Sequence, residues 1–420
     1  MDIHSILNTR QMPMMNTTSP TKTHFTPFLI TGVTAGILSA WLDTAYSTPV
    51  TFSTFFASWI NFYSLMFLFA YKEAATLRRA LLITLIPSLL ATLPCFWTTH
   101  HFYTSSCLLF ISAYALNAFH LHYQRHTFST LHYSTLFYGV WDTFASLLIT
   151  LFFTLLCWML LGICAGLFSI VDITFLKTLL LKGWFETGIT TFFICAGLYI
   201  PAQADNIVRN VRTILLLICR YLLIPLAVIA ILFIVLLAFH GHQKTLSHSA
   251  QYLFFAIAFL SVLFLNGVYQ DGMNEKEYPR ILKLICRIFI IITPIFSLLA
   301  IRGIVLGPDN AIQQNGINTD NFYSLVNMVI LFAYTLWYAI TAVNSKPHWL
   351  KSIEKANVIL AVALIATTLV VSMPLIYHTL PKRPPLIHTT PLSCSSTPPR
   401  NGSSNMIENG GRILSSRKIK

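Results

Sequence analysis

The stretch ILLLICRYLLIPLAVIAILFIV, from Ile214 to Val235, decides the class of this protein. It is apolar apart from Arg220, one tyrosine and one proline. A helix of about 20 such residues crosses the roughly 30 Å hydrocarbon layer of a membrane. The stretch therefore predicts a transmembrane helix, and the long arginine side chain near its start can reach the headgroup layer.

The rest of the chain has the same character. Of its 420 residues, 55% are hydrophobic and only 10% are charged, whereas soluble domains carry about 25% charged residues. Apolar runs of spanning length recur and predict an all-α polytopic transmembrane helical bundle of about eleven spans. The predicted spans are 27–45, 50–70, 79–98, 102–121, 141–168, 185–203, 213–239, 249–269, 284–304, 322–343 and 357–377.

Composition divides the chain into three regions. Residues 1–26 form a polar N-terminal segment, which lacks the apolar core of a cleavable signal peptide. Residues 27–377 hold the predicted spans. Residues 378–420 are rich in proline, serine, asparagine and glycine, which predicts a disordered basic tail.

The net charge of +13 could indicate nucleic-acid binding. However, the basic residues are scattered between apolar runs and form no stripe interleaved with aromatics, so we expect no nucleic-acid partner. Their distribution predicts a multi-pass membrane protein with a cytoplasmic N-terminus. The expected partner is the lipid bilayer, and the sequence names no protein partner. An odd number of spans places the basic tail outside, which conflicts with the charge rule unless one span is miscounted.

The tetrapeptide Leu-Ile-Cys-Arg occurs twice, ending at Arg220 and at Arg287. A proline that distorts a helix follows each copy, namely Pro225 or Pro294. These features suggest a two-span unit that occurs twice, as in transporters built from repeats. Chance in a chain rich in leucine and isoleucine is the alternative. The two units would be residues 207–271 and 274–344.

Charged residues in or beside apolar runs are the candidate substrate-binding groups. We single out Arg220, Arg287 and Glu186, because ionisable residues inside membranes often mark substrate or ion pathways. The alternative is that both arginines are anchors in the membrane interface. Glu186 and Asp142 would then be residues at helix starts, where the helix dipole favours acidic side chains.

Four histidines, His120, His122, His126 and His132, gather in one connection. His122 and His126 have the i, i+4 spacing that can hold a metal on a helix face, but no HExxH motif is present, so we expect no metal site. Phosphate-binding, dinucleotide-binding, redox and hydrolase motifs are absent as well. We therefore expect no cofactor and no enzymatic activity.

Two further patterns concern packing. The GxxxG patterns Gly32–Gly36 and Gly162–Gly166 predict close helix contacts within the bundle. The stretch 170–184 predicts either a helix that lies in the membrane interface or an extension of the preceding span.

Three segments resemble one known family. They are RYLLIPLAVIAILFIVLL from Arg220, IFIIITPIFSLLAIRGI from Ile288 and AIQQNGINTDNFYSLVNMVILFAYTLWYAI from Ala311. Together they resemble the bacterial membrane-protein family called domain of unknown function 4153, over residues 205–345. Gly316 stands at the family's glycine in the connection before the last span, whereas Asn315 replaces its tyrosine. The resemblance implies a polytopic inner-membrane protein and adds no established activity.

The charges inside apolar spans lead to a prediction of function. We expect a transporter-like or permease-like protein for a small anionic solute or a lipid. The alternative is a non-transporting envelope sensor or assembly partner, whose loop 304–321 and tail would contact other proteins.

Overall fold

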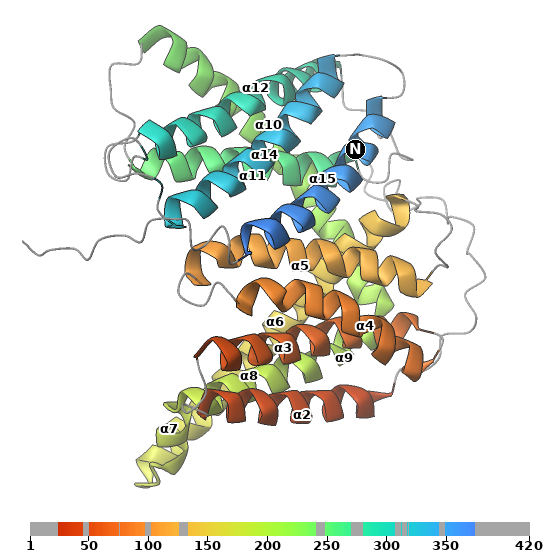
Figure 1. The fold of residues 1–420 in the computed structure, drawn as a ribbon, viewed down its shortest axis with the longest axis vertical. Helices are drawn as coiled ribbons and strands as arrows, with labels where there is room; N and C mark the ends of the chain where they lie inside the picture. Colours follow the sequence, from red (N-terminus) through yellow and green to blue (C-terminus); the bar gives the residue numbers. More distant parts are fainter. Residues whose placement is uncertain are drawn as a thin grey trace, which may run out of the picture. The chain divides into compact units, whose positions relative to one another are not determined.

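The computed structural model describes residues 24–44, 50–74, 76–96, 102–125, 133–240, 248–269, 280–306, 312, 317, 319–343 and 349–373. Every regular element in these ranges is a helix (Figure 1). Most of the predicted N-terminal segment, the predicted tail and Gly316 lie outside the described residues.

The helices follow one another along the chain with short connections. They are α2 (Phe25–Thr44), α3 (Val50–Glu73), α4 (Leu77–Thr92), the 3-10 turn η1 (Leu93–Phe96), α5 (Phe102–Arg125), α6 (Tyr133–Ile170), α7 (Phe175–Leu180), α8 (Gly183–Gly197), α9 (Tyr199–Gln203), α10 (Asp205–His240), α11 (His248–Tyr269), α12 (Arg280–Leu306), α14 (Thr319–Val343) and α15 (Trp349–Val371).

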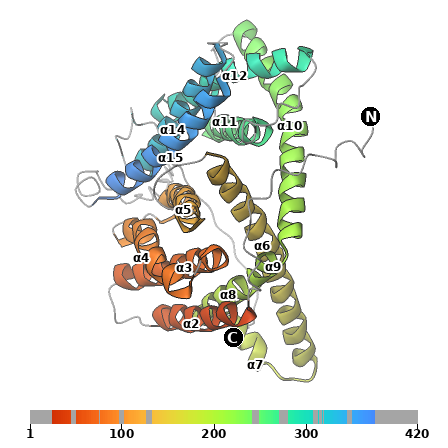
Figure 2. The same ribbon diagram turned by 90° about the vertical axis from the view of Figure 1, so that its right-hand side faces the viewer.

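Two groups of helices each enclose an apolar core. One core lies between α10, α11, α12, α14, α15 and the start of α6, and Leu223, Phe289 and Phe296 are fully buried in it. The other lies between α2, α3, α4 and α8, around Phe28. Helices α5 and α6 contact both groups and therefore join them (Figures 1 and 2).

Ten of the described helical segments are long and apolar enough to cross a membrane, so the chain is a multi-span integral membrane protein. Their outward faces carry large apolar side chains, such as Leu151, Phe152 and Leu155 of α6, which are 63 to 64% exposed. Such faces suit contact with lipid tails. The predicted polytopic helical bundle is thus confirmed.

Contacts between helix ends show how the helices alternate in direction. Lys72 at the end of α3 forms an ion pair with Asp205 at the start of α10. Arg79 at the start of α4 donates a hydrogen bond to the carbonyl of Tyr123 near the end of α5, over 3.3 Å. We call this end of the helices the ion-pair end. Here α3, α5, α9, α11 and α14 end, and α2, α4, α6, α10, α12 and α15 begin.

The remaining helices fit the same alternation. Asn266 near the end of α11 and Asn357 near the start of α15 both hydrogen-bond to Tyr338 near the end of α14. Arg287 near the start of α12 donates to the carbonyl of Ala342 near the end of α14, over 3.1 Å. These contacts all lie at the ion-pair end.

The opposite end, which we call the far end, has its own contacts. Asp43 at the end of α2 lies beside Gly183 at the start of α8, where an added Cβ would be 3.3 Å from the carboxylate. Leu108 in the first half of α5, Tyr323 of α14 and Val371 of α15 share a buried cluster. Within the described residues α5 thus runs between the same two ends as the ten apolar segments. Its position fits the eleventh span that the sequence predicts, which stays a prediction.

The stretch 170–184 is not an extension of the preceding span. Helix α6 ends at Ile170, and Asp172 has a φ of 60°, a left-handed conformation that turns the chain. The separate short helix α7 follows, with Phe175 72% exposed. Whether α7 lies in the membrane interface stays a prediction.

The two GxxxG patterns behave differently. Gly32 and Gly36 pack against α8, where a Cβ added at Gly36 would lie 2.7 Å from the carbonyl oxygen of Gly188. The predicted close helix contact is therefore confirmed there. It is wrong for Gly162 and Gly166, because an added Cβ on either would meet no described atom within 4 Å.

Candidate functional site

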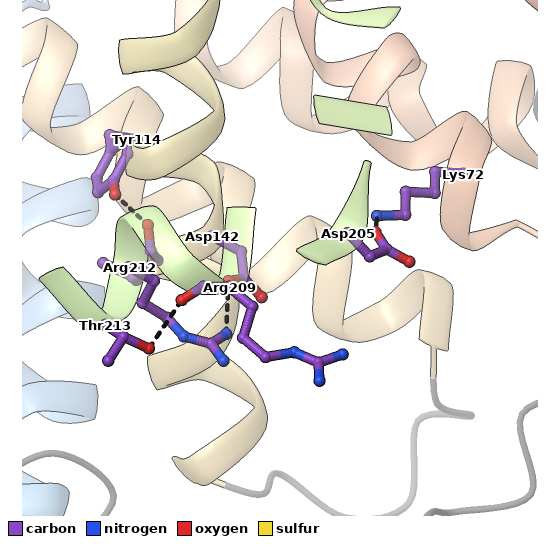
Figure 3. A network of polar contacts seen from close by, with 8 residues as sticks. Lys72, Tyr114, Asp142, Asp205, Arg209, Arg212 and Thr213 are labelled. Atoms are coloured by element: carbon purple, nitrogen blue, oxygen red, sulfur yellow. Dashed lines mark hydrogen bonds and ion pairs between the residues drawn. The ribbon is translucent and has the colours of Figure 1, made fainter. Parts of the chain in front are cut away.

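The main charged contact inside the helix bundle joins α6 to α10 (Figure 3). Arg212 Nη1 lies 2.5 Å from Asp142 Oδ1, and the guanidinium carbon of Arg212 lies 4.7 Å from the centre of the Tyr138 ring. The Arg212 and Asp142 side chains are 17% and 30% exposed. The carboxylate and the ring both attract the guanidinium, and they replace part of the hydration that it loses.

The interpretation of Asp142 as a helix-start residue is wrong. Helix α6 begins at Tyr133, so Asp142 lies more than two turns inside it, beyond the free N–H groups of the first turn. Its charge is instead compensated by Arg212. Tyr114 of α5 donates its hydroxyl proton to the carbonyl of Val140, which holds α5 against the same turn of α6 (Figure 3).

A second ion pair, between Lys72 and Asp205, ties α3 to the start of α10 (Figure 3). Its side chains are 30% and 58% exposed, so it contributes about 0 to 1 kcal/mol. Asp205 lies in the first turn of α10, where the helix dipole also favours a negative charge. In the same view, the guanidinium of Arg209 extends away from Asp142.

Four side chains from four helices form what we call the amide–tyrosine cluster. They are Tyr133 of α6, Asn266 of α11, Tyr338 of α14 and Asn357 of α15. Asn266 Nδ2 donates to the Tyr338 hydroxyl over 2.9 Å, and that hydroxyl donates to Asn357 Oδ1. Asn357 Nδ2 donates to Asn266 Oδ1 and to the Tyr133 hydroxyl, each over 2.7 Å. The hydrogen bonds among the two asparagines and Tyr338 close into a ring.

The amide–tyrosine cluster carries no charge, and Tyr338 is 1% exposed. Buried polar groups that satisfy one another stabilise one arrangement of their helices, because loss of a partner leaves the others unpaired at about 1–3 kcal/mol. We interpret the cluster as the contact that sets the positions of four helices near the ion-pair end.

Helix α5 carries a third set of polar side chains. Asn117, His120 and Gln124 are 5%, 2% and 3% exposed. His120 Nε2 lies 3.2 Å from Thr84 Oγ1 of α4 and 3.3 Å from Gln124 Nε2. Asn117 Nδ2 lies 3.4 Å from Thr143 Oγ1 of α6. These polar residues make α5 less apolar than its neighbours.

The three predicted substrate-binding residues do not come together. Arg287 donates its Nε–H to the carbonyl of Ala342, in the last turn of α14, where carbonyls lack partners within their own helix. Arg220 is half-buried on α10, about two turns beyond Arg212. Glu186 is exposed in the first turn of α8, at the far end, which confirms the interpretation of it as a helix-start residue.

The repeated tetrapeptide places its cysteine inward in both copies. Cys219 and Cys286 are 6% and 2% exposed. Pro225 lies within α10 and is exposed, whereas Pro294 lies within α12 and is buried. The repeat of a two-span unit stays a prediction, since a shared inward face is what any amphipathic helix would show.

The predicted histidine pair cannot be assembled from the described residues. His122 lies buried in α5, and His126 and His132 lie outside the described ranges. In the part of the chain that is described, no three His, Cys, Asp or Glu side chains lie together as metal ligands.

No family model, no curated protein and no solved structure matches this chain. The resemblance to the domain of unknown function 4153 stays a prediction, and the function has to be argued from the geometry above.

Sequence reasoning missed the pairing of Asp142 with Arg212 and the whole amide–tyrosine cluster. A signal for the cluster was present, because Asn266, Tyr338 and Asn357 are polar residues inside or beside apolar runs. It could have indicated buried polar side chains, although not which of them would meet.

Proposed function

We propose that the chain is a transporter-like or permease-like protein of a bacterial inner (plasma) membrane. The observation that carries the proposal is the Asp142–Arg212 pair between two crossing helices. Removing two charges from water costs several kcal/mol per ion. A membrane anchor or scaffold gains nothing from this desolvation cost, whereas transport pathways require polar groups inside the membrane.

We propose further that the ion-pair end faces the cytoplasm. Arg78 and Arg79 lie at the start of α4, and Arg209 lies near the start of α10, all at this end. Cytoplasmic segments of membrane proteins carry an excess of lysine and arginine. The charges therefore support the cytoplasmic N-terminus that the sequence predicts.

The position of the Asp142–Arg212 pair suits a gate. Helix α6 contacts both helix groups, and Arg212 lies on the first helix of the C-terminal group. Many transporters work by movement of one helix bundle against another around a fixed site. Breaking and remaking this pair would accompany such a movement. The predicted anion ligand Arg220 lies about two turns further along α10.

The proposal is tested with the full-length protein purified and reconstituted in liposomes. Uptake of chloride, phosphate and short carboxylates is compared between wild type, Arg212→Ala and the exchanged pair D142R/R212D. The matched control is Lys72→Ala, which breaks the more exposed ion pair.

A purely structural pair would let the exchanged variant regain stability and flux together. We expect it to regain thermal stability and to remain at least tenfold slower in flux. Flux at the level of protein-free liposomes for these anions and for neutral solutes alike would refute transport and leave the sensor or assembly role as the better explanation.

A further inference from the structure

The polar face of α5 carries a further inference, which rests on the proposed transport function and names the kind of solute. Asn117, His120 and Gln124 are spaced three and four residues apart, so they share one face of the helix. Helix α5 contacts α3, α4, α6, α14 and α15. At 5% exposure or less, these three side chains face other helices and not lipid.

The hydrogen bonds around His120 decide which nitrogen carries its proton. Thr84 Oγ1 donates its single proton to the carbonyl of Ala80 over 2.6 Å. The hydroxyl oxygen can then only accept from His120 Nε2, which lies 3.2 Å away. Nε2 therefore carries the proton, and Nδ1 has a free lone pair. With Nε2 as a donor, Gln124 turns its amide oxygen toward the imidazole and its NH₂ group away.

Each of the three side chains keeps one polar atom without a hydrogen-bond partner among the described residues. These atoms are His120 Nδ1, Asn117 Oδ1 and the outer amide atom of Gln124. A buried polar atom without a partner costs about 1–3 kcal/mol. Half of the six such atoms among the described residues gather on this one helix face, and each of them calls for a physical explanation. The face is therefore suited to a ligand that forms hydrogen bonds.

We propose that this face, with Thr84 and Thr143 beside it, binds a small uncharged solute that both donates and accepts hydrogen bonds, such as urea or glycerol. We call it the α5 site. The lone pair of His120 Nδ1 and the oxygen of Asn117 accept hydrogen bonds, and the NH₂ group of Gln124 donates them.

The charges near the α5 site exclude the other classes of solute. The five side chains of the site are uncharged, and Asp142 on the neighbouring helix α6 is paired with Arg212. Arg79 at the start of α4 donates to the carbonyl of Tyr123 near the end of α5. A cation or an anion would enter without a counter-charge, at a cost of several kcal/mol. An anion would also meet the lone pairs of His120 and Asn117. A neutral solute avoids both penalties.

The test uses the full-length protein in liposomes and measures urea and glycerol permeability by stopped-flow light scattering. Asn117→Leu removes the amide and keeps the size of the side chain. We expect it to reduce the protein-dependent solute flux at least tenfold. The matched control is Ser372→Ala, which removes another buried hydroxyl without a partner. It lies at the far end beside Val371, whose cluster reaches α5 at Leu108 and not at Asn117, and it should leave the flux unchanged.

A second measurement does not depend on any variant. Nitrogen-15 NMR of wild-type protein with labelled histidine should show a resonance from an unprotonated, solvent-shielded Nδ1, and that resonance should shift when urea or glycerol is added. If no histidine resonance responds to either solute at saturating concentration, the α5 site is refuted even where Asn117→Leu does not fold.

The outcomes separate this inference from the transport proposal. If anions cross in an Arg212-dependent way and urea and glycerol do not, the transport proposal stands and the α5 site falls. If only water permeability depends on Asn117, the face binds water alone and the inference is wrong. If no solute crosses, both proposals fall.

Discussion

A single methyl group at Gly36 should force α2 and α8 apart. A Cβ at Gly36 would lie 2.7 Å from the carbonyl oxygen of Gly188, and a Cβ at Gly188 would lie 2.9 Å from the carbonyl oxygen of Gly36. Both obstacles are backbone atoms, which cannot rotate away as a side chain does. Ordinary contact begins at 3.4 Å, so the helices must separate by about 0.7 Å, the difference between 3.4 and 2.7 Å.

The separation sets the size of the effect. Inserting a carbon into a packed site typically costs about 1–3 kcal/mol, and gaps of 0.5–1 Å remove roughly a quarter to a half of each dispersion contact. Replacing a glycine inside a helix by alanine returns about 0.5–1 kcal/mol. We therefore expect Gly36→Ala to lower the free energy of unfolding by about 1–2 kcal/mol.

Gly162→Ala is the matched control, since it makes the same chemical change in α6 where no described atom lies within 4 Å of the added Cβ. It should raise the free energy of unfolding by about 0.5–1 kcal/mol. The measurement is reversible unfolding of purified protein in mixed micelles with increasing denaturing detergent, followed by tryptophan fluorescence. Equal effects of the two substitutions, or stabilisation by Gly36→Ala, would refute the close contact of α2 with α8.

Three further predictions concern the polar contacts and the threading. Asp142→Asn leaves the guanidinium of Arg212 without its counter-charge and should lower the free energy of unfolding by about 1–3 kcal/mol. The loss is smaller than for a fully buried pair, because both side chains keep some exposure. An exchanged pair D142R/R212D no more stable than the single variant would contradict this. Tyr338→Phe opens the hydrogen-bonded ring and should cost about 1–3 kcal/mol, whereas an unchanged unfolding midpoint would show that the ring is not formed. Single cysteines at Thr44 and Val171, in a cysteine-free background in intact cells, should label from the same side, because four crossings separate them; labelling from opposite sides would show that α5 does not cross.

The positions of ten crossings were predictable, because the bilayer sets a minimum apolar length for a span. Each apolar run of about 20 residues could be read directly from the chain. Helix α5 shows the limit of this reading. Its run is interrupted by Asn117, His120 and Gln124, which neighbouring helices cover, so apolar character alone does not identify it as a span.

Side-chain partners could not be predicted in the same way. Asp142 and Arg212 are 70 residues apart, and both resemble boundary residues when seen alone. Their contact depends on where α6 begins and on the rotation of α10 about its axis. The apolar pattern of a span fixes neither the start of α6 nor the rotation of α10, because residues that face lipid and residues that face other helices are both apolar. For the same reason the sequence singled out Arg287 and could not show that it would bind the end of α14.

The length of α6 couples this protein to the thickness of its membrane. At 38 residues the helix is about 57 Å long, while the hydrocarbon layer is about 30 Å thick. Its apolar part, residues 141–168, is still about 42 Å long, and a mismatch of this kind is relieved by tilt, by kinking or by local thickening of the bilayer. Helix α10 has 36 residues, meets α6 near α9 (Figure 2) and is tied to it by Arg212. In a thinner bilayer both helices would therefore tilt further, and the two helix groups that they connect would shift with them. Lipid chain length would thus act on the contact between α6 and α10 that the Asp142–Arg212 pair holds.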